Sequence, residues 1–285
     1  MFRIAYVNGR YRPYPEAMVH VEDRGYQFSD GVYEVCEVRD GHLIDERRHI
    51  ERLQRSLGAL RMIAPMSNAA LAVVLRETIA RNRVRNGIVY LQVTRGVARR
   101  DHAFPATPTR AALVVTARRL DRSKSAQEAA QGVTVVSVPD NRWARVDIKS
   151  ISLLPNVLAK QAAREQGARE AWFVDSAGFV TEGSSSNAWI VTSDGRLLTR
   201  PADHSILRGI ARTVVLEVAT AHHVKVEERP FTIQEAYQAR EAFMTAASQI
   251  VLPVVRIDGH VIGQGKPGPI ATALRRDFHR HAEVS

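Results

Sequence analysis

VDIKSISLL, at residues 146–154, and VTEGSSSN, at residues 180–187, are the two stretches that decide the fold. In the first stretch Lys149 stands among apolar, strand-forming residues, in a chain that has only five lysines and otherwise uses arginine. An apolar surrounding disfavours the ammonium form and so favours the nucleophilic amine. The alternative is a lysine that protects the edge of a strand.

The chain has 285 residues, 45% of them hydrophobic, which is enough for one large domain or two ordinary ones. We expect no secretory leader, because the first residues lack an apolar stretch followed by a small-residue cleavage site, and no apolar run reaches the roughly 18 residues that a membrane span needs. Cys36 is the only cysteine, so intramolecular disulfides and thiolate metal cages are excluded. These features predict a cytoplasmic protein.

The formal net charge is +10, which raises the possibility of nucleic-acid binding. The basic residues are spread along the whole chain, however, and acidic residues alternate with them, as in Asp45–Arg48 and Glu227–Arg229. Such interleaving is typical of an ordinary solvated surface. We therefore expect small anionic substrates and no nucleic acid or membrane as partner.

Four X-Gly pairs lie between segments rich in β-branched and aromatic residues and indicate tight hairpins in largely antiparallel sheets. These pairs are Asn8-Gly9, Asp40-Gly41, Asp194-Gly195 and Asp258-Gly259. Helical spacing occurs at about 46 to 62, 68 to 84 (behind Ser67 as N-cap), 155 to 166, 206 to 220, 232 to 239 and 268 to 281. The irregular order of strands and helices predicts an α+β fold.

A polar stretch at residues 118–125, RRLDRSKS, separates the predicted strands Ala111–Ala117 and Val133–Val138. We place a linker there. It divides the chain into a small N-terminal domain, residues 1–120, and a larger C-terminal domain, residues 121–285.

Two motifs match known sites only in part. Gly263–Gly268 has the letters of a dinucleotide fingerprint, but Pro267 removes a backbone donor and too few residues follow for a second βαβ strand. The serine run lacks the glycine of a nucleophile elbow, which argues against a serine hydrolase. No histidine spacing suits a metal, so we expect no metal ion.

The two opening stretches resemble the class IV aminotransferases, which are pyridoxal 5′-phosphate enzymes of fold type IV. Two further stretches, EDRGYQFSDGVYEV at residues 22–35 and the loop with Thr94–Gly96 and Arg100–His102, are similar to the D-amino-acid transaminases within that family. The resemblance covers nearly the whole chain. It implies a small N-terminal α/β domain, a larger C-terminal domain with a barrel-like sheet, the cofactor between them, and a homodimer.

The resemblance also implies roles for residues in catalysis. Lys149 would form the Schiff base with the cofactor and then move the proton at the substrate's α-carbon. Glu182 would face the pyridine nitrogen and keep it protonated. Ser185 and Ser186 would form hydrogen bonds near the cofactor and Lys149.

Phosphate binding is implied for Arg52, and for the helix that begins with Ile210 and Ala211 after Leu207 and Gly209, because free amides at a helix start suit an anion. Leu207 would pack against the cofactor ring. Ala211, Ala246 and Ala247 occupy positions where the related D-transaminases often have hydroxyl groups.

Tyr33, Arg100 and His102 match the α-carboxylate trap of the D-amino-acid transaminases, in which the neighbouring subunit supplies the Arg-x-His loop. The expected reaction is ping-pong transfer of an amino group between D-amino acids, such as D-alanine and D-glutamate, and 2-oxo acids such as 2-oxoglutarate. An L-branched-chain aminotransferase or an aminodeoxychorismate lyase on the same fold is the alternative, although these relatives lack the Arg-x-His loop.

Overall fold

Tight turns set the order of many strands. In the computed structural model, which describes residues 3–285, both residues of Asn8-Gly9, Asp40-Gly41 and Asp258-Gly259 have positive φ, the conformation of a type I′ hairpin. The turns join β1 (Ile4–Val7) to β2 (Arg10–Pro13), β3 (Gly31–Arg39) to β4 (His42–Leu43), and β14 (Ile250–Ile257) to β15 (His260–Val261). At Asp194-Gly195 only the glycine has positive φ, and a wider turn joins β10 (Asn187–Val191) to β11 (Leu197–Thr199). The structure confirms all four predicted turns.

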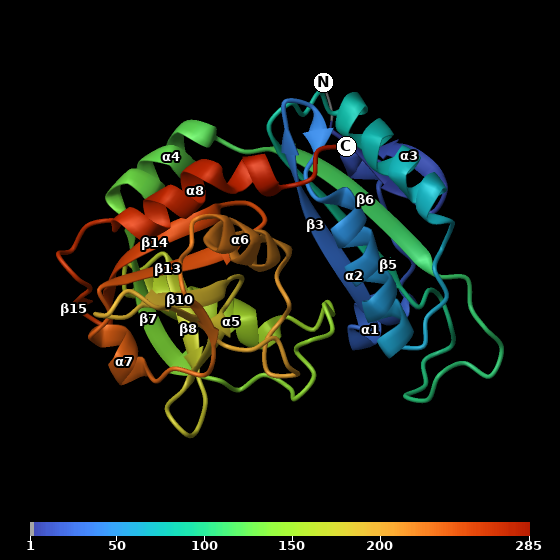
Figure 1. Ribbon diagram of the computed structural model, residues 1–285. Helices are drawn as coiled ribbons and strands as arrows, with labels where there is room; N and C mark the ends of the chain where they lie inside the picture. Colours follow the sequence, from blue (N-terminus) through green and yellow to red (C-terminus); the bar gives the residue numbers. More distant parts are fainter. Residues whose placement is uncertain (1–2) are drawn as a thin grey trace. The chain divides into compact units, whose positions relative to one another are not determined.

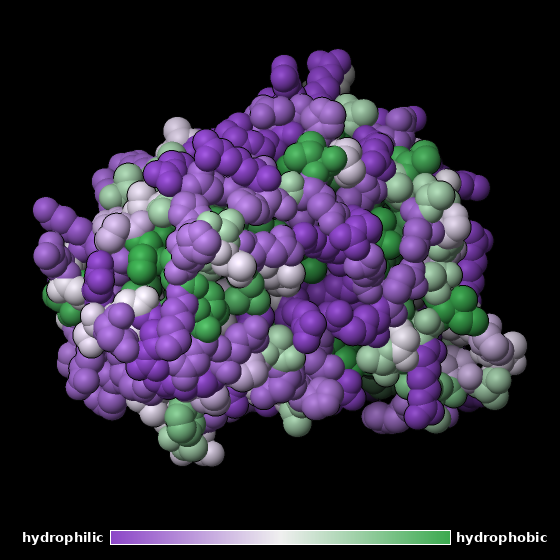
Figure 2. Space-filling view, viewed as in Figure 1, coloured by the Kyte–Doolittle hydropathy of each residue, from purple (hydrophilic) through white to green (hydrophobic). Residues whose placement is uncertain are grey.

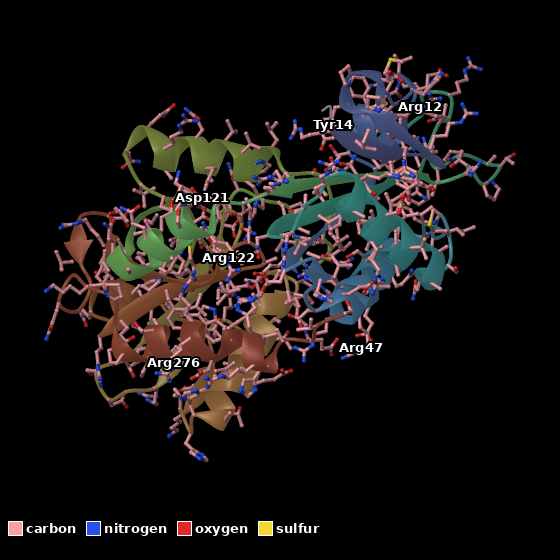
Figure 3. All side chains as sticks on the ribbon, turned by 90° about the horizontal axis from the view of Figure 1, so that it is seen from above. Arg12, Tyr14, Arg47, Asp121, Arg122 and Arg276 are labelled. Atoms are coloured by element: carbon pink, nitrogen blue, oxygen red, sulfur yellow. The ribbon has the colours of Figure 1, made fainter. Side chains whose placement is uncertain are left out.

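The chain forms two compact units. Unit 1 comprises the residues up to Asp121 together with Ile148–Ser152 and Glu283–Ser285, and unit 2 comprises Arg122–Asp147 and Leu153–Ala282. Asp121 and Arg122, where the chain first passes between the units, are labelled in Figure 3. Two short segments of the expected C-terminal domain thus belong to unit 1, because their backbones pair with its strands.

The sheet of unit 1 has six strands in the order β2-β1-β6-β5-β3-β4, and every neighbouring pair is antiparallel. It is completed by β5 (Gly87–Thr94) and β6 (Ala112–Arg119). Alternate residues of β3, among them Val32 and Cys36, face α2 (Glu46–Ala59) and α3 (Asn68–Arg81), which bury their leucines against them. Figure 1 shows α2 lying along this sheet. Ser67 caps α3 as predicted, accepting a hydrogen bond from the Ala70 N–H at 3.2 Å.

Ile148–Ser152 returns to the free edge of β3 and extends the sheet there. The N–H of Tyr33 donates to the carbonyl of Lys149 at 3.0 Å, and the N–H of Ile151 donates to the carbonyl of Gly31 at 3.1 Å. Gly31 permits this approach, because a Cβ on it would lie 2.7 Å from the Val93 carbonyl oxygen and 3.0 Å from Ile151 Cδ1. The edge position of the lysine is therefore built by residues far apart in the sequence.

Unit 2 is built on a curled, half-barrel sheet of nine strands in the order β12-β11-β10-β13-β14-β7-β8-β9, with β15 beside β14. Its other strands are β7 (Val133–Pro139), β8 (Glu170–Val174), β9 (Val180–Gly183), β12 (Val226–Glu228) and β13 (Glu241–Ala246). Most pairs are antiparallel, as expected, but β7 pairs in parallel with β8 and β14, and β11 with β12. Together the units confirm the α+β class.

Four helices of unit 2 follow the predicted spacing, with shifted ends. They are α5 (Leu154–Glu165), α6 (Ile210–Ala221), α7 (Ile233–Tyr237) and α8 (Pro269–His281). α6 and α8 share one apolar cluster with β10 and β13, which includes Val214, Leu274 and Phe278. In unit 1 the short η1 (Tyr14–Glu16) and α1 (Arg24–Phe28) were not predicted.

Residues 118–125 differ from the predicted linker. Arg118 and Arg119 are the last residues of β6, and Arg122 opens a further helix, α4 (Arg122–Gln131). The polar composition that suggests a linker reflects exposed positions of these two elements. The regular structure is interrupted only at Leu120 and Asp121.

Polar side chains dominate the surface. Figure 2 shows hydrophilic residues over most of the face it draws. Among residues 3–285, no helix combines the length and the apolar character needed to cross a membrane.

The glycine-rich stretch Gly263–Gly268 leads into α8, as a structural loop would. Gly268 is the N-cap of α8, and the buried Glu241 of β13 accepts hydrogen bonds from the N–H groups of Ile270 at 3.1 Å and Ala271 at 3.0 Å. Glu241 thus occupies the amides that an anionic ligand would need at this helix start. A Cβ on Gly268 would lie 2.0 Å from Glu241 Cδ.

We expect Gly268→Ala to lower the free energy of unfolding by roughly 1 to 3 kcal/mol, because the methyl group displaces the Glu241 carboxylate that caps α8. Gly58→Ala in α2 is the matched control, because a Cβ there meets no atom within 4 Å. Alanine has the higher helix propensity, so this change should raise the free energy of unfolding by about 0.5 to 1 kcal/mol. Urea denaturation followed by circular dichroism measures both. Equal effects of the two changes would contradict the capping role of Glu241.

Candidate functional site

Lys149 lies beside Tyr33 in unit 1. Its Nζ is 4.0 Å from the centre of the Tyr33 ring, and its backbone N–H donates to Ser56 Oγ of α2 at 3.3 Å. Ile148, the preceding residue, is buried in the core, so the backbone of the segment is fixed on both sides of the lysine. Lys149 is half-buried and lies on a short segment that is hydrogen-bonded to the edge of β3.

Arg52 is buried on α2, one turn before Ser56, and is not a surface arginine. Its Nε and Nη2 donate to the two oxygens of Glu34 at 2.7 and 2.8 Å, and His49 Nδ1 lies 2.8 Å from the same carboxylate. Burial raises the pKa of Glu34, but Arg52 and His49 outweigh it and lower the pKa well below its usual range. The bidentate pair fixes the plane of the Arg52 guanidinium.

Glu182, on β9 of unit 2, is a buried carboxylate held by three donors. Arg142 Nη1 pairs with Oε1, while Oε2 accepts hydrogen bonds from Asn187 Nδ2 at 3.0 Å and from the Leu207 N–H at 3.1 Å. Arg142 also pairs with Asp140 at 2.7 Å. Burial lowers the pKa of Arg142, but Asp140 and Glu182 outweigh it and raise the pKa, so the guanidinium stays charged.

The serine run turns toward a second buried carboxylate. Glu170, only 1% exposed at the start of β8, accepts hydrogen bonds from Ser184, from Ser185 at 2.9 Å and from Ser186 at 3.4 Å. Lys160 Nζ lies 3.1 Å from the same group. Since a carboxylate only accepts, the hydroxyl groups of Ser184 and Ser185 donate their protons to Glu170 and can only accept from any other partner. The single proton of Ser186 has two acceptors within reach, Glu170 at 3.4 Å and Met244 Sδ at 3.5 Å.

The start of α6 is joined to the Glu182 network. Asn187 Nδ2 donates to the Leu207 carbonyl at 2.9 Å, and Gly209, the N-cap, is pressed against Asn187: a Cβ there would lie 2.1 Å from its Oδ1. Asn187 also pairs with Thr245 across the sheet, directly before Ala246 and Ala247. The amides of Ile210 and Ala211 therefore open α6 close to the Ala246-Ala247 turn.

Arg100 and His102 come together on one aromatic ring of unit 1. Arg100 Cζ lies 4.7 Å from the centre of the Phe28 ring, and the His102 ring centre lies 5.4 Å from it. The buried Arg24 donates to the carbonyls of Asp101 at 2.6 Å and His102 at 3.4 Å. Both Arg100 and His102 are exposed, on a loop whose backbone is anchored from beneath.

The expected residues thus gather in separate groups: Lys149, Tyr33 and Arg52 near α2, Arg100 and His102 on Phe28, and Glu182 with Leu207 and Gly209 in unit 2. Three residues of these groups were not predicted from the sequence: Arg142, Glu34 and Glu170. A local signal existed for Arg142, since Asp140 stands two residues before it at a strand end. Its second partner, Glu182, is 40 residues away and leaves no periodic signal.

The family model described as "Amino-transferase class IV" matches residues 31–257. The chain is 38% identical over 279 residues to a D-alanine aminotransferase of Staphylococcus haemolyticus, covering 98% of this chain and 97% of that one. It is 41% identical over 265 residues to the D-alanine aminotransferase of Listeria monocytogenes serotype 4b, covering 92% and 90%.

Solved structures share the fold. The branched-chain amino acid aminotransferase of Escherichia coli superposes with a TM-score of 0.91 at 24% identity, covering 98% of this chain and 94% of that one. A hypothetical aminotransferase from Mycobacterium tuberculosis, in its PLP-bound form, has a TM-score of 0.84 at 21% identity, covering 98% of each chain. At these levels of identity both likenesses concern the fold alone.

We expect Arg142→Met to lower the free energy of unfolding at pH 7 by about 3 to 5 kcal/mol, because it leaves the buried Asp140 and Glu182 carboxylates without their cation. Burial raises the pKa of Asp140, but Arg142 outweighs it and lowers the pKa. The pairing of Asp140 with Arg142 therefore stabilises the fold fully at pH values above about 4, the usual carboxyl pKa. This stabilisation is lost as the pH falls through the lowered pKa of Asp140.

The loss caused by Arg142→Met should accordingly be full near pH 7 and shrink only as the pH is lowered below about 4, as measured by denaturant unfolding at several pH values. Arg145→Met removes an exposed ion pair with Asp147 and serves as the control, with little expected change. A pH-independent loss would show that packing, rather than charge pairing, makes Arg142 important.

Proposed function

Because the chain belongs to the class IV aminotransferases and is a pyridoxal 5′-phosphate enzyme, we propose that it transfers amino groups between D-amino acids and 2-oxo acids such as 2-oxoglutarate. Similarity to D-alanine aminotransferases over nearly the whole chain supports this substrate class. The observation that carries the proposal is the pairing of Arg100 with His102 on Phe28, which presents two donors suited to a carboxylate.

The residues present fit the cofactor. Glu182 is a carboxylate, so it can face a protonated pyridine nitrogen. Before the cofactor binds, its negative charge is balanced by Arg142. Lys149 is half-buried and offers its amine from a segment that is hydrogen-bonded to β3. When bound, the cofactor supplies an electron sink for the substrate's α-carbon.

Lys149 Nζ is proposed both to hold the cofactor covalently and to carry the proton to and from the α-carbon. Tyr33 supports this role, since its ring lies against Nζ and limits the directions in which the amine can swing. Ser185, whose hydroxyl donates to Glu170, would contribute acceptor lone pairs near the cofactor, and Ser186 would form a hydrogen bond beside it. Leu207 would pack against the ring.

The phosphate would be bound by Arg52 and by the start of α6, with Gly209, Ile210 and Ala211. Glu34 supports Arg52 by fixing its guanidinium plane, and the positive end of the α6 dipole favours a dianion. Ala246 and Ala247 would contribute through their backbone, because their side chains offer no hydroxyl.

The substrate's α-carboxylate would be held by Tyr33 of one subunit and by the loop with Arg100 and His102 of the other subunit of a homodimer. Exposed apolar side chains border this loop: Met18 is 77%, Val21 72% and Tyr26 75% exposed. Val97 joins the same region through a bridge to Asp23. Such an apolar border suits a second copy of the chain. The single, buried Cys36 fits the reducing cytoplasm.

Lys149→Ala tests the proposed chemistry. We expect loss of steady-state transamination between D-alanine and 2-oxoglutarate, and loss of the lysine adduct that borohydride traps in the parent protein and mass spectrometry maps. Lys225→Ala, an exposed lysine, is the control and should keep both. If borohydride traps an adduct at another lysine in Lys149→Ala, that lysine and not Lys149 forms the covalent link.

Arg100→Ala tests the D-amino-acid assignment. An arginine can hold a carboxylate through two charge-assisted hydrogen bonds, each worth about 1.5 to 3 kcal/mol, so kcat/KM for D-alanine should fall by roughly ten- to several-hundred-fold. The cofactor spectrum should be unchanged. Arg99→Ala, the exposed neighbour outside the trap, should behave like the parent.

If the loop serves the neighbouring subunit, mixing Arg100→Ala with Lys149→Ala subunits should restore part of the activity, because a heterodimer holds one intact lysine and one intact loop at the same site. A parent protein that prefers L-amino acids, or an Arg100→Ala variant as active as Arg99→Ala, would favour the L-branched-chain alternative.

A further inference from the structure

A basic cavity of about 630 Å³, open to solvent, lies in unit 1 at the end of β3 opposite Lys149. It is formed where α3 ends, β5 begins and β6 ends, with the β3–β4 turn at Gly41 closing one side. Arg100 and His102 stand on the loop at the opposite end of the β5–β6 hairpin. None of the residues assigned to transamination lines this cavity.

Four arginines line it: Arg76, Arg83, Arg85 and Arg119. Arg76 is neutralised by Glu46, which it contacts through both oxygens at 2.6 and 2.9 Å. Arg83, Arg85 and Arg119 make no ion pair with any residue between 3 and 285. The cavity therefore holds about three positive charges that the protein itself does not balance.

The frame around these charges is fixed by the backbone. The N–H of Gly41 donates to the Arg85 carbonyl at 2.8 Å, and the N–H of Leu120 donates to the Asn86 carbonyl at 3.2 Å. Arg119 Nη2 donates to the Arg83 carbonyl at 3.1 Å. The turn, the loop before β5 and the end of β6 are thus tied together, so a ligand would meet a preformed site.

The wall of the cavity is partly apolar. Its apolar surface comes mainly from the half-buried Leu120, because Ile79 and Val84 belong to the core of unit 1 and reach the cavity only with edges that are 5% and 3% exposed. Small-molecule sites commonly combine a volume of about 300 to 1,000 Å³, an apolar wall and a few placed polar groups. A bare inorganic anion would leave the apolar wall unused.

We propose that this cavity binds a nucleoside diphosphate or an equally sized phosphorylated compound. Its phosphates would be held by Arg83, Arg85 and Arg119, whose planar guanidinium groups suit phosphate oxygens. Its ring would lie on Leu120, beside the small exposed edges of Ile79 and Val84. The proposal is independent of the transamination reaction, since its residues take no part in the groups around Lys149 and Glu182.

Isothermal titration of the cofactor-loaded protein with ADP, inorganic pyrophosphate and adenosine tests this site, because loading removes the cofactor's own phosphate site from the measurement. ADP should bind with a Kd below about 1 mM at low salt, weakening as salt rises. Pyrophosphate should bind more weakly than ADP, and adenosine should show no binding. Those two probes separate the contribution of charge from that of the apolar wall.

The double variant Arg83→Asn, Arg85→Gln should weaken ADP binding by roughly ten- to a hundred-fold. Asparagine tolerates the positive φ of 50° at position 83. The control, Arg10→Asn with Arg164→Gln, removes the same charge from exposed positions elsewhere and should bind ADP like the parent. Transaminase activity and circular dichroism should be unchanged in both.

No heat of ADP binding up to several millimolar would overturn the proposal. So would equal weakening in the two double variants, since that result would assign the binding to overall charge. Pyrophosphate binding as tightly as ADP would contradict the role of the apolar wall.

Discussion

A carboxylate that is removed from water must be matched by donors, and three buried glutamates organise the molecule through this constraint. Glu34 aligns Arg52 and His49 on α2, Glu182 is held by Arg142 and the start of α6, and Glu170 collects the hydroxyl groups of the serine run. In each case the carboxylate dictates where its neighbours point. The polar groups proposed to handle cofactor and substrate are thus positioned before any ligand arrives.

The sequence predicted those features whose cause is local. Glycine pairs with positive φ determine the hairpins, Ser67 caps α3, and apolar spacing marks the long helices, so these elements could be placed from neighbouring residues alone. The role of Arg142 could not be predicted in this way, because its partner Glu182 lies on a strand 40 residues later in the sequence. The boundary predicted within residues 118–125 does fall there, after Asp121, but the stretch is not an irregular linker, because exposed ends of a strand and a helix have the same composition.

The place of Lys149 depends both on its neighbours in the sequence and on distant residues. Its apolar neighbours are visible in the sequence, and Ile148 does enter the core. The strand beside which it lies, however, comes from residues more than a hundred positions earlier, and five residues at a sheet edge give too short a pattern to identify a partner. Gly31 makes the pairing possible by leaving room for Ile151, a requirement that appears only once the two backbones are placed together.

The return of two distant segments to unit 1 has a consequence for folding during synthesis. When the ribosome has released the residues up to Asp121, the edge of β3 still lacks Ile148–Ser152, and Leu43 still lacks its backbone hydrogen bonds with Ser285. Exposed edges of this kind invite pairing with other chains. The nascent N-terminal half should therefore need protection, by a chaperone or by speed of elongation, until the residues that cover its edges emerge.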